Sequence, residues 1–160
     1  ITPSGRKKVL YDFGAKHFGS DGSSPDAGLI DVGGTLYGTT FDGGTHADGT
    51  VFSITLSGTE KVLHSFSFST VFRDSDGVEP SAPLIKVKGT LYGTTVQGGA
   101  YGGGTVFSIT TAGKEKVLHS FGNGDGTAPY AGLINVNGTL YGTTQDGGAY
   151  NSGTIFALST

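Results

Sequence analysis

The chain repeats one sequence pattern three times with a period of roughly 50 residues, and this repetition constrains the fold more than any other feature. Self-similarity at such a period is typical of repeat architectures, in which each copy forms one supersecondary unit. Three motifs recur in the same order. They are Leu-Tyr-Gly-Thr-Thr, starting at Leu36, Leu91 and Leu140; Gly-Thr-(Val/Ile)-Phe, starting at Gly49, Gly104 and Gly153; and Val-Leu-(His/Tyr), starting at Val9, Val62 and Val117.

The residue composition favours strands over helices. The chain has 30 Gly, 10 Phe and 7 Tyr among its 160 residues. Aromatic and β-branched residues favour strands, and glycine supplies the positive φ angles of tight turns. No segment keeps an apolar period of 3.6 residues, so the sequence predicts an all-β fold.

Each complete copy is predicted to form a four-stranded antiparallel meander. In the first copy we expect strands at 29–32, 35–40, 50–55 and 61–66. Only the connection from the fourth strand to the next copy varies in length, and loops tolerate such changes better than strand registers do. The predicted organisation is one repeat domain over 1–160, with blades at 28–66 and 83–121, three strands of a blade at 132–160, and a fourth strand at 1–13.

Four-stranded meanders that repeat in this way indicate the blades of a β-propeller. A β-sandwich is the alternative, but it does not explain three copies of one meander. Propellers have about four to eight blades, so three blades are too few to close a ring. The strand at 154–160 lacks a following fourth strand, and the strand at 1–13 lacks the three before it, so we expect the two to be complementary.

This complementarity predicts association with other chains. The simplest closed assembly is a homodimer with six blades, in which the N-terminal strand of each copy completes the last blade of the other. Head-to-tail contacts that do not close would give a filament. A third possibility is that this chain is one part of a longer repeat array. The residues expected to form the contact are Val9, Tyr11 and Phe13 in the N-terminal strand and Ile155, Phe156 and Leu158 in the last strand.

The composition also excludes several classes of function. The chain has no cysteine, so it forms neither disulfides nor thiolate metal sites. Its net charge of −3 argues against a nucleic-acid partner. No apolar run approaches the roughly 20 residues that a membrane-spanning helix needs, so we expect no membrane span.

Five motifs follow one another in a fixed order along the chain: Val-Leu-His-Ser-Phe, Asp-Gly-x-x-Pro, Gly-Leu-Ile, Gly-Thr-Leu-Tyr-Gly-Thr-Thr-x-x-Gly-Gly and Gly-Thr-Val-Phe. This order resembles the Gloeo/Verruco (GloVer) tandem repeat over almost the whole sequence. GloVer repeats occur in exported bacterial proteins, so the resemblance implies an extracellular or cell-surface protein. It implies no known activity and no catalytic residues.

The best candidate binding site combines two sets of loops on one face of the meanders. One set carries an aromatic or imidazole ring, and the other carries an aspartate in the Asp-Gly-x-x-Pro motif. Aromatic faces beside carboxylates in a glycine-rich groove suit a glycan, although Asp-Gly is also ordinary turn chemistry. The candidate residues are His46, Tyr101 and Tyr150 in the first set and Asp21, Asp76 and Asp125 in the second.

Metal binding and catalysis find little support in the sequence. The segments 74–77 and 123–126 resemble calcium loops only in part, because neither continues to an acidic residue at the required spacing. His64 and His119 are replaced by Tyr11 in the other copy, which favours packing over metal ligation.

The sequence therefore predicts a non-catalytic β-propeller without metal or cofactor, which self-associates by strand exchange and binds a glycan or another surface ligand, and the GloVer resemblance implies that it is extracellular. The alternative is a structural protein that forms a filament or surface layer and binds no small ligand.

Overall fold

The computed structural model describes residues 4–16, 19–68 and 76–160, and these residues form strands, turns and loops with no helix. The all-β prediction is therefore confirmed. The strands are β1 (Ile30–Val32), β2 (Thr35–Thr40), β3 (Thr50–Thr55), β4 (Glu60–Ser65), β5 (Ile85–Val87), β6 (Thr90–Thr95), β7 (Thr105–Ile109), β8 (Glu115–Ser120), β9 (Ile134–Val136), β10 (Thr139–Thr144) and β11 (Thr154–Ser159).

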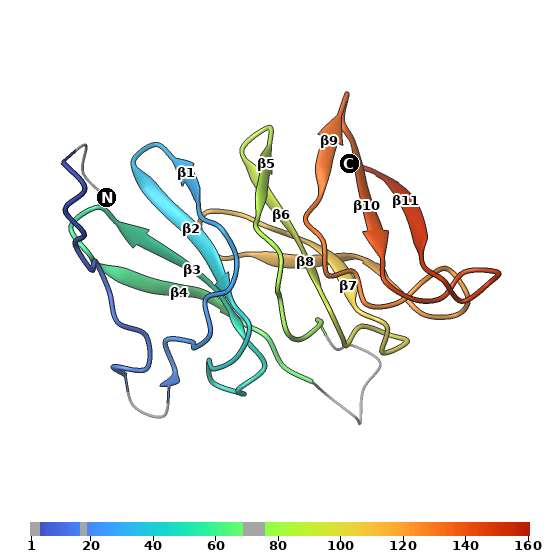
Figure 1. Ribbon diagram of the computed structural model, residues 1–160, viewed down its shortest axis with the longest axis horizontal. Helices are drawn as coiled ribbons and strands as arrows, with labels where there is room; N and C mark the ends of the chain where they lie inside the picture. Colours follow the sequence, from blue (N-terminus) through green and yellow to red (C-terminus); the bar gives the residue numbers. More distant parts are fainter. Residues whose placement is uncertain (1–3, 17–18, 69–75) are drawn as a thin grey trace.

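Three antiparallel sheets stand side by side along the molecule (Figure 1). Two have four strands in sequence order, β1 to β4 and β5 to β8, and the third has three strands, β9 to β11. The hairpins β1–β2, β5–β6 and β9–β10 lie at the upper side of the array, and the loops β2–β3, β6–β7 and β10–β11 lie at the lower side (Figure 1). Each repeat thus forms one meander, as the motif spacing predicts.

Two-residue turns join the first and second strands of each sheet. Their central residues have positive φ, as the type I′ hairpin requires. Gly33 and Gly34 adopt φ of 63° and 85°, and Asn137 and Gly138 adopt 53° and 90°. The right-handed twist of the flanking strands favours this turn, so its geometry sets the register of each hairpin.

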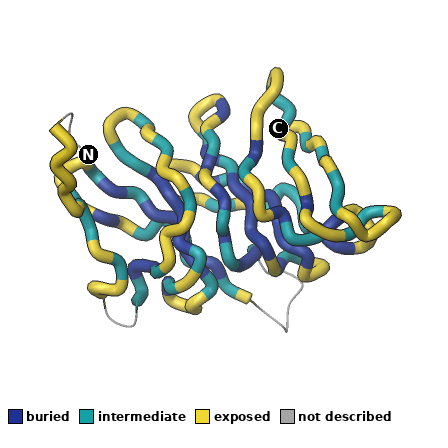
Figure 2. The backbone as a smooth tube through the Cα atoms, in the orientation of Figure 1, coloured by how far each residue is buried: buried dark blue, intermediate teal, exposed yellow. Residues whose placement is uncertain are grey.

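The sheets pack face to face through two hydrophobic interfaces. The buried residues gather in the strands at the centre of the array (Figure 2). The first interface joins Tyr37, Val51 and Phe66 of the first repeat to Leu84, Leu91, Phe107 and Ile109 of the second, with Ile30, Val32 and Leu63 packed against them. The second interface joins Val87, Val106 and Phe121 of the second repeat to Leu133, Leu140, Phe156 and Leu158 of the third.

A phenylalanine pair marks each place where a fourth strand meets the following sheet. Phe66 packs against Phe107 with ring centroids 5.2 Å apart, and Phe121 packs against Phe156 at 4.9 Å. Phe13 packs against Phe52 in the same way, also at 4.9 Å. The N-terminal segment therefore packs against the first sheet in the same way that the end of each fourth strand packs against the sheet that follows it.

The backbone of the N-terminal segment follows the same pattern. A Cβ atom added to Gly58 would collide with the carbonyl oxygen of Leu10, just as one added to Gly113 would collide with that of Leu63. Residues 4–13 nevertheless form no strand, because none of the strands in the described part of the chain pairs with them. Residues 1–3 lie outside the described part, so the strand predicted at 1–13 stays a prediction for the associated state.

The glycine of Leu-Tyr-Gly-Thr-Thr makes room for the phenylalanine of the neighbouring third strand. A Cβ atom at Gly93 would lie 2.6 Å from Cζ of Phe107 and 2.8 Å from Cδ2 of Leu84. We predict that Gly93→Ala lowers the free energy of unfolding by about 1–3 kcal/mol through overpacking. Gly28→Ala is the matched control, because its nearest neighbour would lie 3.9 Å away. Urea unfolding measures both variants, and an equal loss in both would contradict this account.

Candidate functional site

The three candidate aspartates all bind the side chain of the preceding fourth-strand position. The hydroxyl of Tyr11 donates a hydrogen bond of 2.6 Å to Asp21. In the next two repeats a histidine replaces the tyrosine, and Nε2 of His64 and of His119 lies 2.5 Å and 2.7 Å from the carboxylates of Asp76 and Asp125. One acceptor thus suits both residue types, because a phenol and an imidazole can each donate a hydrogen bond.

The second oxygen of each carboxylate accepts a backbone hydrogen bond where the connection to the next repeat begins. The donors are the N–H groups of Gly14, Ser67 and Gly122, at 3.2, 3.1 and 3.1 Å. Each aspartate therefore ties the fourth strand to the loop that follows it. This role gives the recurrence of the Asp-Gly-x-x-Pro motif a structural basis.

Asp21 is the most enclosed of the three, since its side chain is fully buried. Burial alone would raise its pKa, but hydrogen bonds from Tyr11, Lys16 and Gly14 outweigh that cost and hold the pKa below its usual value. For Tyr11, burial and then the bond to Asp21 raise the pKa above the ordinary range. In this copy the carboxylate is ionised and the phenol neutral at pH 7.

A glutamate from the next sheet extends each of the first two pairs into what we call a junction cluster. The first junction cluster consists of Tyr11, Asp21, Glu60 and Lys16, and the second of His64, Asp76 and Glu115. Sequence reasoning missed these glutamates. The repeated Glu-Lys-Val-Leu-His, at 60–64 and 115–119, was the signal that could have revealed them.

The two junction clusters balance their charges differently. In the first, the ammonium group of Lys16 lies 2.5 Å from Oε2 of Glu60. In the second, no ion pair joins a lysine to Glu115 among the described residues, whereas Oε1 of both glutamates is buried without a hydrogen-bond partner. Burial raises the pKa of Glu115 to about 7, with Asp76 adding to the rise and His64 opposing it. The second cluster therefore holds a carboxyl group that is partly protonated near neutral pH.

The second junction cluster also has the ligand types that bind a metal ion, since its three candidate ligand atoms lie within 4.8 Å of one another. However, Nε2 of His64 and Oδ2 of Asp76 are only 2.5 Å apart. Two ligands of a tetrahedral ion with bonds of about 2.0–2.1 Å would be separated by about 3.3 Å. The spacing is that of a direct hydrogen bond. Of the partial calcium loop at 74–77, residues 74 and 75 lie outside the described residues.

The candidate ring residues lie in the loops at the lower side of the array (Figure 1). His46, Tyr101 and Tyr150 are all exposed, and Tyr150 is 92% exposed. Tyr101 packs over Gly122, next to the loop that carries Asp125. In the described residues, no hydrogen bond joins a ring of this set to a candidate aspartate. The structure thus brings the two loop sets to one side but directs the carboxylates toward the fourth-strand side chains Tyr11, His64 and His119.

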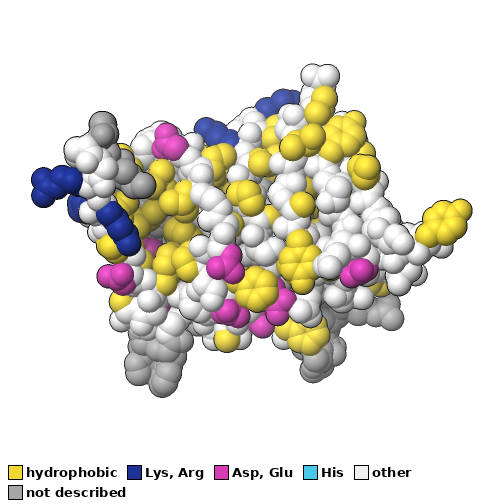
Figure 3. Space-filling model, in the orientation of Figure 1, with side chains coloured by type: hydrophobic (Ala, Val, Ile, Leu, Met, Phe, Trp, Pro, Cys, Tyr) yellow, Lys and Arg dark blue, Asp and Glu magenta, His cyan; other side chains and the backbone are white. Residues whose placement is uncertain are grey.

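Two apolar surfaces lie on the outer sheets, one on each; in the first, Leu29 is exposed while Phe52 and Ile54 are already buried. The first, which we call the N-terminal groove, lies between residues 7–13 and the first sheet and has a volume of about 510 Å³. Its apolar lining includes Leu10, Phe13, Leu29, Leu36, Phe52 and Ile54. The second, which we call the C-terminal face, consists of Ile134, Val136, Tyr141 and Ile155. Figure 3 shows hydrophobic side chains gathered at both places.

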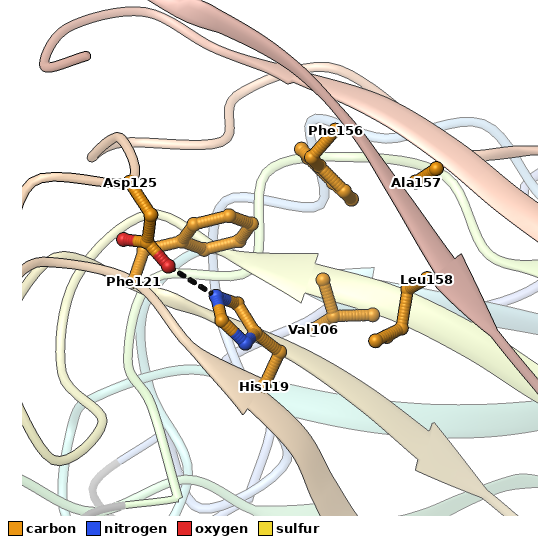
Figure 4. Close-up of a pocket in the computed structure, with 7 residues that line it drawn as sticks. All are labelled: Val106, His119, Phe121, Asp125, Phe156, Ala157 and Leu158. Atoms are coloured by element: carbon orange, nitrogen blue, oxygen red, sulfur yellow. Dashed lines mark hydrogen bonds and ion pairs between the residues drawn. The ribbon is translucent and has the colours of Figure 1, made fainter. Parts of the chain in front are cut away.

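A smaller pocket of about 190 Å³ lies beside His119 and Asp125 (Figure 4). The hydrogen-bonded pair forms one side, and Val106, Phe156 and Leu158 lie across from it (Figure 4). Its lining residues His119, Asp125 and Leu158 are the repeat equivalents of His64, Asp76 and Ile109, the residues next to Glu115 in the second junction cluster. The pocket is open because the third sheet has no fourth strand among the described residues.

The repeat pattern that builds these features matches a known family. Residues 1–160 match the Gloeobacter/Verrucomicrobia repeat over the full length of the sequence. The chain belongs to this family. Among proteins with curated descriptions, none matches the chain. The described residues contain no helix long and apolar enough to cross a membrane.

The raised pKa of Glu115 predicts a pH dependence of stability. The folded chain binds this proton more tightly than the unfolded chain does, because the pKa rises from 4.5 to about 7. The resulting stability is present below about pH 4.5 and is lost as the pH rises through about 7. Glu115→Gln should therefore show a smaller fall in the free energy of unfolding than the parent chain between pH 5 and pH 8. Urea unfolding measures this difference, and identical pH profiles would contradict the assignment.

Proposed function

We propose that this chain is a non-catalytic, extracellular repeat protein that self-associates head to tail. The C-terminal face of one copy packs into the N-terminal groove of a second copy, and the N-terminal segment of that second copy becomes the fourth strand of the third sheet. The proposed extracellular location is supported by the resemblance to exported repeat proteins. The assembly proposal rests on the apolar composition of the N-terminal groove and of the C-terminal face.

The C-terminal face repeats a surface that is covered elsewhere in the chain. Its residues Ile134, Val136, Tyr141 and Ile155 occupy the repeat positions of Ile30, Val32, Tyr37 and Val51, which pack in the first interface. In the third repeat the same positions are between 36% and 83% exposed. Monomeric soluble proteins rarely leave such a contiguous apolar patch open, so a partner surface is expected.

The N-terminal groove has the complementary composition. Its residues Leu29, Leu36, Phe52 and Ile54 occupy the repeat positions of Leu84, Leu91, Phe107 and Ile109, which form the other half of the first interface. The groove contains one half of an interface and the C-terminal face contains the other half. A second copy of the chain is therefore the occupant that this chemistry supports.

Strand pairing would extend the contact. The outer edge of β11 has no partner among the described strands, so its backbone N–H and C=O groups are available for pairing. In the second sheet Phe107 pairs with Val117 and Ile109 with Glu115. The same register would place Val9 of the second copy opposite Phe156. Such strand addition supplies main-chain hydrogen bonds, while side chains of alternate residues fix the register.

Two copies joined at both ends would form a six-bladed β-propeller, within the usual range of about four to eight blades. Contacts that fail to close would form an open filament instead. We propose the closed dimer because it leaves no β11 edge unpaired. The alternative, a structural filament or surface layer without a small ligand, uses the same contact.

The native mass of the 160-residue chain tests the association. We predict a species of twice the chain mass in multi-angle light scattering over a dilution series. Ile155→Asp should raise the dissociation constant by at least about a hundredfold, because the contact would bury an unpaired carboxylate. Ile155 is 83% exposed in the single chain, so this change should not prevent folding.

Tyr150→Ala serves as the control, since Tyr150 is exposed and lies outside both apolar surfaces. It should associate as the parent chain does. A heavy, length-distributed species would support the filament. A folded parent chain that stays monomeric at high concentration would overturn the proposal.

We propose glycan binding as a second activity of the same assembly, carried by the exposed rings of Tyr101 and Tyr150. Aromatic faces stack on the C–H faces of sugars, and a dimer would present each ring twice, which raises avidity. Asp21 is fully buried and is unsuited to direct contact with a ligand. Asp76 and Asp125 remain candidate acceptors, since their side chains are 21% and 46% exposed.

A glycan array tests this activity. Tyr150→Ala should weaken binding about tenfold, while Tyr150→Phe keeps the stacking ring and should bind as the parent chain does. If the parent chain binds no glycan even at high valency, the lectin hypothesis is wrong and the structural alternative gains support.

A further inference from the structure

The third junction cluster is incomplete in a single chain. The first two clusters draw one acidic side chain from the fourth strand of the following sheet, namely Glu60 and Glu115. Among the described residues the third consists of His119 and Asp125, with the pocket of Figure 4 beside them. The residue that completes it must come from whatever segment pairs with β11.

The repeat register identifies that residue. Glu60 pairs with Ile54, and Glu115 pairs with Ile109. Leu158 is the equivalent of these isoleucines, so the missing residue lies opposite Leu158. In the N-terminal segment, Gly5-Arg-Lys-Lys-Val9 aligns with Gly113-Lys-Glu-Lys-Val117, and Lys7 therefore takes the position of Glu115. The first and second junction clusters, which form within one chain, have a carboxylate at this position. The third cluster, completed by a second copy, would have the ammonium group of Lys7 there.

We infer that Lys7 of one copy forms an ion pair with Asp125 of a second copy, and that this pair distinguishes the intermolecular junction from the internal ones. The inference rests on the proposed head-to-tail association. It assigns a recognition role to a lysine that is exposed in the single chain.

The pocket beside Asp125 suits a lysine side chain. Phe156 and Leu158 offer an apolar wall for the methylene stem, while Asp125 lies at the other side (Figure 4). The two oxygens of Asp125 already bind His119 and the N–H group of Gly122, but an ionised carboxylate can accept about four hydrogen bonds. The first junction cluster provides a precedent, because the ammonium group of Lys16 neutralises Glu60 there.

The charge of the side chain at the Lys7 position also affects which strand pairs with β11. A glutamate would bring a second carboxylate close to Asp125; in the second junction cluster burial is the main cause of the raised pKa of Glu115, and the nearby Asp76 raises it further. A lysine replaces that repulsion with attraction. Opposite charges at a contact favour the correct partner and speed encounter, and they do so less at high salt.

The dissociation constant of the parent chain and of three variants tests the ion pair, measured by sedimentation at low and high salt. We expect Lys7→Gln to raise the dissociation constant on the order of tenfold and to reduce its salt dependence. Lys8→Gln is the matched control, because side chains alternate along a strand and its equivalents Lys61 and Lys116 are exposed. In an Asp125→Asn background, Lys7→Gln should have little further effect, since its partner charge is gone.

The outcomes separate this inference from the proposed function. If the parent chain associates but Lys7→Gln and Lys8→Gln have equal effects, the Lys7 assignment is overturned and the association stands. The same holds if the effect of Lys7→Gln persists in the Asp125→Asn background. If the parent chain does not associate at any concentration, both proposals are overturned.

Discussion

The packing of one sheet on the next is the interaction on which the rest of the structure depends. A four-stranded meander has two faces, and in these repeats both are partly apolar, so no sheet can bury its own surface alone. The third-strand phenylalanine reaches a neighbouring fourth-strand phenylalanine because the second strand carries a glycine where any Cβ atom would collide with it. This requirement explains why Leu-Tyr-Gly-Thr-Thr and Gly-Thr-(Val/Ile)-Phe always occur together, and why a single repeat would expose too much apolar surface to be stable.

The strands could be predicted from the sequence because turn chemistry and strand periodicity agree in every copy. The strands at 35–40 and 50–55 have the predicted bounds, and the fourth strand of the first sheet is displaced by only one residue, to Glu60–Ser65. The bulge between Val51 and Phe52 could not be predicted, since it depends on how β3 and β4 meet in three dimensions. It allows Val62 to lie on the face of Phe52 while His64 lies opposite Val51.

The candidate site was harder to predict, for a physical reason. A loop aspartate beside a glycine indicates a turn, a ligand contact or a cap equally well, and only the position of its partner decides among them. Here the partners are Tyr11, His64 and His119, which sequence reasoning had assigned to packing. Glu115 was missed because it lies near His64 and Asp76 only once two sheets pack together. In sequence it is merely a polar residue at the start of an edge strand.

Under the proposed association, the junctions would mark one contact as different while keeping the same backbone. Hydrophobic packing cannot distinguish them, because the same apolar positions recur in each repeat, and any two such surfaces would fit. A single charged position in the fourth strand can distinguish them, since glutamate and lysine cost little on an exposed edge but have opposite effects beside a fixed aspartate. In this chain that position is Glu60, Glu115 and Lys7 in the three copies. In the proposed assembly the apolar surfaces supply affinity, and Lys7 selects the strand that pairs with β11.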